Sequence, residues 1–293
     1  MPLALLVNPS SAGGKTLKLL PRVEQALDGL RVEFRVQRTR GLEHGAEQAL
    51  RAIEAGEVPV VMSGDGLVGA VGGAMAGSDT PLGIIPGGRG NDLARVLGIP
   101  DEPEEAVATL FSGESRRIDV GEANGKRFLG IVSVGFDSEC NRRANEVKLI
   151  RNNLVYVYSL FRTLASWKPA RFTIRVDDER TRFTGYSVSV ANNSTFGGGM
   201  RIAPGAELDD GLFDIVAISE VGKLRFVANL PKVFKGTHVD GDDVRVFRAA
   251  HLELSASKPF PVYADGEHLT GLPASLRVLP QALSVLVPTP AAT

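Results

Sequence analysis

Residues 58–67 read VPVVMSGDGL, an apolar run that ends in a glycine-rich turn. A short run of branched apolar residues predicts a buried strand, and the pattern near 67–76 predicts a helix directly after the turn. The same order of strand, turn and helix recurs from the start of the chain to about residue 112. We therefore expect an α/β unit of the Rossmann-like type, whose parallel sheet is covered on both faces.

The expected elements follow one another at short intervals, and their pattern changes after residue 117. Before it, strands are predicted at 3–7, 32–36, 58–62 and 82–85, and helices at 15–27, 43–55, 67–76, 92–97 and 104–111. After it, alternating segments predict strands at 127–134, 170–176, 181–191, 212–218, 250–255, 261–264 and 275–279, with helices only at 153–167 and 223–234. The second pattern predicts an antiparallel domain.

Composition excludes several classes of function. The chain has 293 residues, with 33 Lys and Arg against 34 Asp and Glu, which gives no general attraction to nucleic acid or to an anionic bilayer. Cys140 is the one cysteine, the first residues lack the basic flank of a signal peptide, and no apolar run approaches the ~18 to 20 residues of a membrane span. We expect a cytoplasmic protein without a nucleic-acid partner or transmembrane segment, whose membrane contact is peripheral.

Three expected strands of the first unit end in turns rich in small residues, at 8–15, 63–66 and 86–92. In an open α/β sheet, ligands bind beyond the carboxyl ends of the strands, and each turn here leads into a helix whose N-terminal amides attract an anion. Because glycine lacks a side chain, backbone N–H groups approach phosphate oxygens closely at such turns. Three of them at one sheet edge predict a nucleotide or phosphate site.

The first two turns leave alternatives open. The first turn nearly fits the phosphate-loop motif through residues 14–16, but Pro9 stands in place of the leading glycine and supplies no amide donor. In the second turn, Asp65 either holds Mg²⁺ or orients an attacking hydroxyl, or it caps the helix expected to begin at Leu67.

Further carboxylates lie in three turns. Residues 208–214 read LDDGLFD, and three carboxylates around a glycine suit either a divalent cation or a solvated turn. Residues 265–267 read DGE after an apolar strand, so both carboxylates point into one cleft or decorate an ordinary hairpin. Asn91 and Asp92 are interpreted as a helix N-cap pair that stiffens its loop.

Taken together, these motifs resemble those of the diacylglycerol kinase catalytic family, which includes bacterial lipid kinases and sphingosine kinases. The resemblance spans almost the whole chain and rests on the order and spacing of the segments at 7–13, 63–66, 82–95, 209–211 and 265–267. It implies a nucleotide-binding α/β domain over 1–117 and a β-sandwich lipid-substrate domain over 118–282. The active site would lie in the cleft between them, and residues 283–293 are expected to return to the first domain.

The resemblance also implies an activity: an ATP-dependent lipid kinase that transfers the γ-phosphoryl group to a hydroxyl of a lipid such as diacylglycerol, in phospholipid biosynthesis. Glu267 corresponds to the general base, while Asp65 and Asp265 position Mg²⁺ or the hydroxyl. A second, structural Mg²⁺ would take the Asp210 carboxylate and the main-chain carbonyls of Glu207 and Leu212. The ATP site implied by the resemblance comprises Asn8, Pro9, Ser10, Ser11, Ala12, Gly13, Thr39, Gly64, Asp65, Gly66, Gly88, Arg89, Gly90 and Asn91.

Four positions depart from the family pattern. Relatives usually continue the second motif with Thr and an Asn-Glu pair, where this chain has Leu67 and then Gly69-Ala70, and Arg89 replaces a common Thr. Gly69-Ala70 and Arg89 keep open a non-catalytic regulator that binds nucleotide or lipid on a kinase scaffold. A second alternative is a phosphotransferase similar to NAD kinase, whose family shares a Gly-Asp-Gly motif and a comparable two-domain plan.

The lipid substrate must be reached at a membrane surface. A helix at 154–167 carries apolar residues at helical spacing, and basic residues precede it, which suits transient membrane association. A helix packed on the sheet of the second domain has the same pattern. The sequence leaves open which lipid is the substrate and the oligomeric state, a dimer included. The apolar residues are Leu154, Tyr158, Phe161, Leu164 and Trp167, and the basic residues ahead of them are Arg142, Arg143, Lys148 and Arg151.

Overall fold

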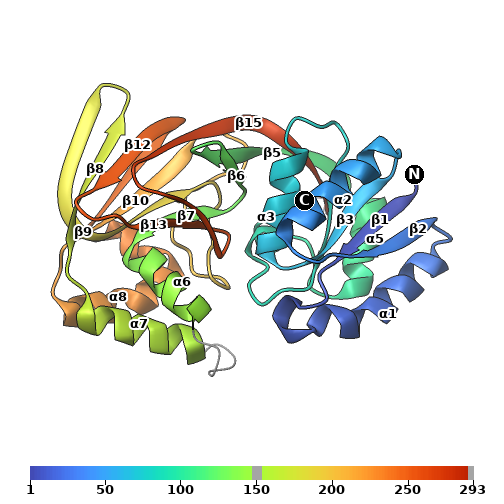
Figure 1. Cartoon of the computed structure of the whole chain (residues 1–293), viewed down its shortest axis with the longest axis horizontal. Coiled ribbons are helices and arrows are strands. Elements are labelled where there is room, and N and C mark those ends of the chain that lie inside the picture. Colours follow the sequence, from blue (N-terminus) through green and yellow to red (C-terminus); the bar gives the residue numbers. More distant parts are fainter. Residues whose placement is uncertain (147–153, 290–293) are drawn as a thin grey trace.

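Four parallel strands form the first sheet, in the order β2-β1-β3-β4 (Figure 1). The computed structural model describes residues 1–146 and 154–289. Every residue of β1, β3 and β4 is buried, as expected for strands that are covered on both faces. The strands are β1 (Leu3–Val7), β2 (Phe34–Arg38), β3 (Val58–Ser63) and β4 (Gly83–Pro86).

Helices cover this sheet in two pairs, α1 with α5 and α2 with α3. In α1, Leu20, Val23 and Leu27 recur at a spacing of three to four residues and are buried against the sheet. The helices are α1 (Lys15–Gly29), α2 (Leu42–Glu54), α3 (Asp65–Met75), α4 (Asp92–Val96) and α5 (Pro103–Ser112). The predicted α/β unit with a parallel sheet is therefore confirmed.

An antiparallel sheet of eleven strands builds the second part of the molecule. Its main path runs β14-β13-β7-β9-β8-β12-β15-β5-β6, and β10 and β11 continue from β9. The strands are β5 (Glu114–Ala123), β6 (Lys126–Phe128), β7 (Ile131–Gly135), β8 (Ala170–Val176), β9 (Glu179–Ala191), β10 (Phe213–Ser219), β11 (Val244–Ala249), β12 (His251–Ala256), β13 (Pro261–Ala264), β14 (Glu267–Gly271) and β15 (Ala274–Val287).

Strands from distant parts of this sheet enclose one apolar core. Phe128 of β6 and Phe213 of β10 stack with their ring centroids 5.8 Å apart, although the two strands are far apart in the sheet order. Such a closure makes the sheet a sandwich around its core. At one end of the core lie three helices, α6 (Phe136–Glu146), α7 (Leu154–Ser166) and α8 (Lys223–Lys235).

Helix α7 is the helix that was expected to face the membrane, and only some of its predicted apolar residues are exposed. Leu164 and Trp167 are buried in the core of the second part, where Trp167 packs edge-on against Phe136, so these two residues cannot face a membrane. Tyr158 and Phe161 are exposed. Of the basic residues expected ahead of the helix, Arg142 and Arg143 both pair with Glu139. Lys148 and Arg151 lie outside the described residues.

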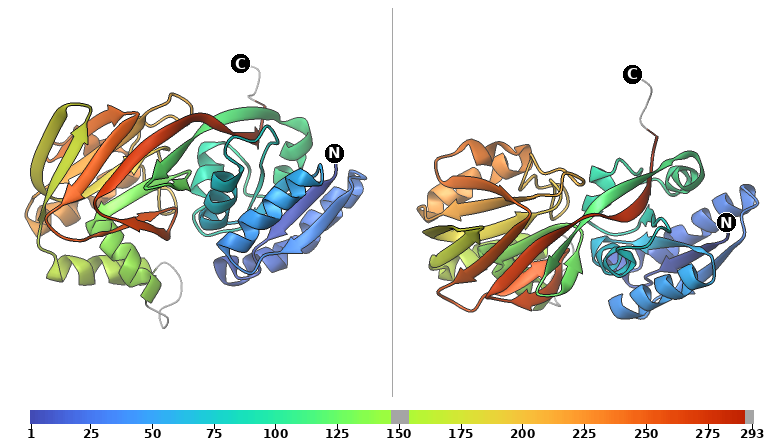
Figure 2. Two further views of the ribbon diagram at one scale, coloured as in Figure 1. Left: turned by 45° about the horizontal axis from the view of Figure 1, so that its top comes forward. Right: turned by 90° about the horizontal axis from the view of Figure 1, so that it is seen from above.

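The two parts of the molecule share a long strand pair, β5 with β15, which runs from one part into the other (Figure 2). Residues Leu283, Val285 and Val287 of β15 are buried in the core of the first part. Leu82, directly before β4, donates its N–H to the Ser284 carbonyl at 2.8 Å, and its own carbonyl accepts the Leu286 N–H at 3.0 Å. The domain division after residue 117 stays a prediction, and β5 crosses it.

Several elements of the second part differ from the expectation. The predicted strand at 127–134 is two strands, β6 and β7, and the one predicted at 275–279 extends from 274 to 287. Strands β5, β11 and β14 and helix α6 were not expected, because their sequences carry many charged or polar residues. Helix α6 follows β7 without a loop, since Gly135 makes the sharp bend at φ +99°.

None of the described helices combines the length and the apolar character that a passage through a bilayer requires.

Candidate functional site

The three glycine-rich turns meet at the carboxyl ends of β1, β3 and β4. The Ser11 hydroxyl donates to the Gly87 carbonyl at 3.2 Å, which joins the first turn to the third. A Cβ at Gly88 would lie 2.4 Å from the Gly64 Cα, so the second and third turns touch only because both positions are glycine. Thr39, at the end of β2, is buried and donates its N–H to the Val7 carbonyl at 2.8 Å.

The first turn is held mainly by its own hydrogen bonds. The Asn8 Oδ1 accepts the N–H of Ser10 at 3.0 Å and its hydroxyl at 2.8 Å. The N–H groups of Gly13 and Gly14 donate to carbonyls of the same turn. Because these amides are used internally and Pro9 has none, the turn differs from the wrapped cradle of the phosphate-loop motif. An anion would instead meet the free amides at the start of α1.

The third turn is ordered by Asn91, whose Oδ1 accepts the Gly88 N–H at 2.8 Å. Asn91 itself adopts a left-handed conformation, with φ +52°. Arg89 is exposed, and among residues 1–146 and 154–289 no carboxylate forms an ion pair with it. Its guanidinium is therefore available for an anion that binds at this turn.

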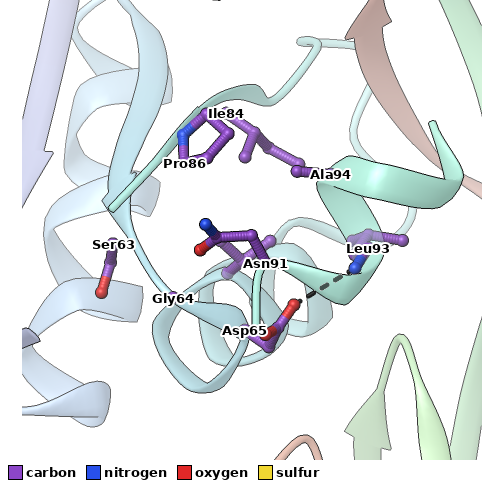
Figure 3. A pocket seen from close by; sticks show the side chains of 9 residues that line it. Ser63, Gly64, Asp65, Ile84, Pro86, Asn91, Leu93 and Ala94 are labelled. Carbon is purple, nitrogen blue, oxygen red and sulfur yellow. Dashed lines mark hydrogen bonds between the residues drawn. The ribbon is translucent and has the colours of Figure 1, made fainter. Parts of the chain in front are cut away.

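Asp65 lies at the base of a small pocket between β3, β4, α3 and α4 (Figure 3). Its Oδ1 accepts the Leu93 N–H of α4 at 3.2 Å. Helix α3 begins at Asp65 itself, with Gly64 at the N-cap, so the interpretation of Asp65 as the cap of a helix starting at Leu67 is wrong. The carboxylate instead ties α3 to α4. The pocket is lined by Ser63, Gly64, Asp65, Val68, Ile84, Pro86, Asn91, Leu93 and Ala94.

The turn between β13 and β14 carries two more carboxylates to the same place. Asp265 and Gly266 both have positive φ, +53° and +84°, as a two-residue hairpin turn requires. A Cβ at Gly66 would lie 3.4 Å from the Glu267 Oε1. A Cβ at Gly69 would lie only 2.6 Å from the Asp265 Oδ2. The segment is thus a hairpin whose two carboxylates pack against α3 in the first part of the molecule, and their sharing of one cleft stays a prediction.

The Asp265 carboxylate is closely surrounded by backbone groups. Its Oδ2 accepts the Leu129 N–H at 3.1 Å, and a Cβ at Gly130 would lie 2.2 Å from its Oδ1. Burial raises the pKa of Asp265 to about 7, with a further contribution from the charge of Asp65, although the Leu129 N–H opposes the shift. Burial also raises the pKa of Asp65, assisted by the charge of Asp92, and burial alone raises the pKa of Glu267. The site thus brings three carboxyl groups together in surroundings that disfavour their ionised forms, and a bound cation would favour ionisation.

This shift predicts how stability depends on pH. The folded protein holds a proton on Asp265 up to about pH 7, whereas an unfolded carboxyl releases it near its ordinary 3.8. Folding stability attributable to this group is therefore lost as pH rises through that window. In the absence of nucleotide and metal, Asp265→Asn should be more stable relative to the unmodified protein at pH 8 than at pH 4, in urea unfolding. Asp178→Asn, in an exposed turn, is the control, and a pH-independent difference for Asp265→Asn would contradict the prediction.

Asp92 connects the two parts of the molecule. Its carboxylate accepts the N–H of Gly198 at 2.9 Å and that of Gly199 at 2.9 Å, both from the second part. It also accepts from Arg95, whose Nη2 donates to the Gly90 carbonyl at 2.9 Å. Asn91 occupies the N-cap position of α4 and stiffens its loop through Gly88, as predicted, but neither the Asn91 nor the Asp92 side chain makes a capping bond to the helix. The glycine triplet at 197–199 was the sequence signal that could have revealed this contact.

The acidic turn at 207–214 lies away from these carboxylates and is organised by Asp119, which the sequence reasoning missed. The Asp119 Oδ2 accepts the Gly211 N–H at 2.7 Å, and its Oδ1 accepts the Gln281 N–H at 2.7 Å. Asp210 accepts the Leu212 N–H at 2.9 Å and forms an ion pair with Arg248. A fully buried aspartate between Ile118 and Val120 was the available signal, since a charge rarely interrupts an apolar strand without a partner.

No group of three His, Cys, Asp or Glu side chains within residues 1–146 and 154–289 is arranged to hold a metal ion. The expected Mg²⁺ at Asp65 and Asp265 would thus have to draw ligands from a substrate or from water. The expected structural Mg²⁺ would rely on the Asp210 carboxylate and the two main-chain carbonyls.

Comparison with known families accounts for both parts of the chain. The family model described as the diacylglycerol kinase catalytic domain matches residues 2–123. The model described as the YegS C-terminal NAD kinase beta sandwich-like domain matches residues 130–287.

Relatives match over nearly the full length. A diacylglycerol kinase of Mycobacterium tuberculosis is 34% identical, covering 97% of this chain and 94% of that protein. A probable YegS-like lipid kinase of Chromohalobacter salexigens is 30% identical, covering 94% and 91%. The crystal structure of a putative diacylglycerol kinase from Bacillus anthracis shares the fold, with a TM-score of 0.80 at 23% identity and coverage of 100% and 96%. The chain belongs to the diacylglycerol kinase family of lipid kinases.

Proposed function

We propose that this protein is a lipid kinase that transfers the γ-phosphoryl group of ATP to a hydroxyl of a lipid such as diacylglycerol. The observation that carries the proposal is the contact of the β13–β14 turn with α3. It sets Glu267 against Gly66 and Asp265 against Gly69, beside the three glycine-rich turns. In this proposal, a proton acceptor from the second part of the molecule would meet the edge of the first part that binds phosphate, as transfer between a nucleotide and a second substrate requires.

In this proposal Glu267 acts as the general base. Its carboxylate takes the proton of the lipid hydroxyl while that oxygen forms a bond to the γ-phosphorus. The bond between this phosphorus and the β,γ-bridging oxygen breaks, and ADP leaves with the electron pair. The raised pKa of Glu267 brings the carboxyl closer to neutral pH, which suits a group that accepts and then releases a proton.

The nucleotide would lie along the three turns. Its phosphates would lie against residues 8–13, 64–66 and 88–91, with the amides at the start of α1 as the donors beside the first turn and with Thr39 completing the pocket. Arg89 supports this placement, because its exposed guanidinium stands on the third turn and forms no ion pair with any described carboxylate.

Bound Mg²⁺ would neutralise charge on the phosphates. The residues present fit such a site, because Mg²⁺ in phosphotransferases takes one or two carboxylates together with phosphate oxygens and water. Asp65 and Asp265 would supply the carboxylates. A separate, structural Mg²⁺ would be held by the Asp210 carboxylate, which pairs with Arg248 in this structure, and by the carbonyls of Glu207 and Leu212.

Two observations bear on the alternatives. The absence of a side chain at Gly69 gives Asp265 its place against α3, which argues against simple decay of the site and so against a non-catalytic regulator. The family model that matches residues 130–287 mentions NAD kinase only to describe its β-sandwich. The model that matches residues 2–123 is a diacylglycerol kinase catalytic domain. NAD therefore stays in the test as a competing acceptor.

The test is transfer of label from γ-labelled ATP, with Mg²⁺, to mixed micelles that contain diacylglycerol, monoacylglycerol, sphingosine or phosphatidylglycerol, with free NAD in parallel. A labelled lipid is the expected result and names the substrate class. Label on NAD alone would favour the NAD kinase alternative. Binding of ATP without any transfer, by protein shown to be folded, would favour the regulator.

A further inference from the structure

Helix α8 has an unusual outer face. Leu224 is 90% exposed, the highest value among the large apolar residues that the structure describes. Ala228, Pro231 and Lys235 follow it at spacings of four, three and four residues, so the four share one side of the helix. Phe226 on the opposite side is buried in the aromatic core. Helix α8 is thus anchored by one face and leaves a mixed apolar and basic face unpartnered.

The end of helix α7 adjoins the start of α8. The Lys223 Nζ at the start of α8 donates to the Ala165 carbonyl near the end of α7 at 2.8 Å, which joins the two helices at these ends. Both lie along the lower edge of the second part in Figure 1. Tyr158 and Phe161 of α7 are 40% and 54% exposed, and Arg162 beside them is exposed as well. We call the exposed positions of the two helices taken together, Tyr158, Phe161, Arg162, Leu224, Lys232 and Lys235, the α7–α8 face.

The charge of this face is one-sided. Neither 154–166 nor 223–235 contains an aspartate or glutamate, although acidic residues slightly outnumber basic ones in the whole chain. Arg225 is paired with Asp243 at 2.7 Å, but no carboxylate pairs with Lys232 or Lys235 among the residues that the structure describes. Exposed apolar side chains with unpaired cations around them are the pattern of a surface that lies on an anionic bilayer.

We propose that the α7–α8 face docks the protein on an anionic lipid bilayer. Leu224, Tyr158 and Phe161 would enter the headgroup region, and Lys232, Lys235 and Arg162 would contact lipid phosphates, their aliphatic stems adding apolar contact. The proposal deepens the lipid kinase function and rests on it for the reason to visit a membrane. It moves the docking surface from the inner side of α7, where Leu164 and Trp167 are buried, to the outer sides of α7 and α8.

A bilayer fits this face better than a second copy of the chain does. A symmetric dimer would place the same face against itself, so Lys232 and Lys235 would meet only residues of that same face. With no carboxylate on either helix, such an interface would be repulsive. An anionic lipid surface offsets these charges and accepts the apolar side chains in the same contact.

The test is flotation with phosphatidylcholine vesicles that contain or lack phosphatidylglycerol. The unmodified protein should bind the anionic vesicles and bind the neutral ones weakly. Lys232→Glu/Lys235→Glu should reduce the anionic partition coefficient at least about tenfold. Leu224→Ser should reduce it about fivefold. All three residues are exposed, so the variants are expected to fold, which thermal unfolding verifies.

Matched variants elsewhere separate a docking face from general charge. Arg180→Glu/Arg182→Glu changes the net charge equally on the exposed β8–β9 hairpin, and Val246→Ser removes a side chain that is 45% exposed on β11. Both should bind vesicles as the unmodified protein does. Equal losses in these controls, or undiminished binding by the α7–α8 variants, would overturn the proposal, and so would a change of oligomeric state in Leu224→Ser.

Transfer to a short-chain, water-soluble diacylglycerol distinguishes this proposal from the proposed function. The α7–α8 variants should keep the full rate on that substrate and lose it on vesicles. If no substrate is phosphorylated but vesicle binding still depends on the α7–α8 face, only the proposed kinase function is contradicted. If transfer is normal but the α7–α8 variants bind vesicles as the unmodified protein does, only the proposed docking surface is contradicted.

Discussion

Replacing Glu267 by Gln should lower the rate of phosphoryl transfer by about two to four orders of magnitude and leave the affinity for ATP nearly unchanged. The amide cannot accept the proton of the lipid hydroxyl, whereas Glu267 contacts Gly66 without holding the nucleotide turns together. The rate of the unmodified enzyme should also fall on acidification, because the base acts only when ionised and burial raises its pKa.

The measurement combines kcat from label transfer with the Kd for ATP from calorimetry. Glu179→Gln, at the exposed start of β9, is the control and should leave both values unchanged. Loss of ATP binding in Glu267→Gln would assign the residue to nucleotide binding instead. Full activity in that variant would remove Glu267 from the reaction.

Restoring the asparagine that relatives usually carry at position 69 should damage this enzyme rather than improve it. A Cβ at Gly69 would lie 2.6 Å from the Asp265 Oδ2, so Gly69→Asn must displace the carboxylate or the β13–β14 turn. Overpacking of this kind destabilises by about 1–3 kcal/mol. A shift of about 1 Å in a group near the reacting atoms lowers the rate about a hundredfold.

Unfolding in urea and kcat should therefore both change in Gly69→Asn, and Gly69→Ala should show the same direction to a smaller extent. Gly29→Ala is the matched control, since Gly29 is also helical and nothing lies within 4 Å of a Cβ there. Improved transfer in Gly69→Asn would show that the glycine had weakened an ancestral site and would contradict the fitted position of Asp265.

The first part of the molecule could be predicted from sequence because local signals there agree. Strands β1, β3 and β4 are continuous apolar runs, each followed by a small-residue turn and a helix, and the structure has them within a residue or two of the prediction. The fold class followed from that repetition. The second part was harder, since β11 and β14 carry charged or polar residues on strands that pair near the sheet margins.

The candidate site divides in the same way. The glycine-rich turns and the carboxylates at 65, 265 and 267 could be predicted from local composition, and the structure brings them together. The contacts of Asp92 with Gly198 and of Asp265 with Gly69 join residues far apart in the chain. No local pattern encodes such a pairing, because it depends on how the two parts of the molecule dock.

The strand pair β5–β15 affects the order in which the protein can be made. Leu283, Val285 and Val287 fill the core of the first part of the molecule, most of which comes from residues 3–120, and the backbone of 284–286 bonds to Leu82. During synthesis, the nucleotide-binding half would leave the ribosome with this part of its core unfilled and would wait for the last strand to arrive. Early folding of one half ahead of the other is thus held back, and maturation of the nucleotide site coincides with completion of the chain.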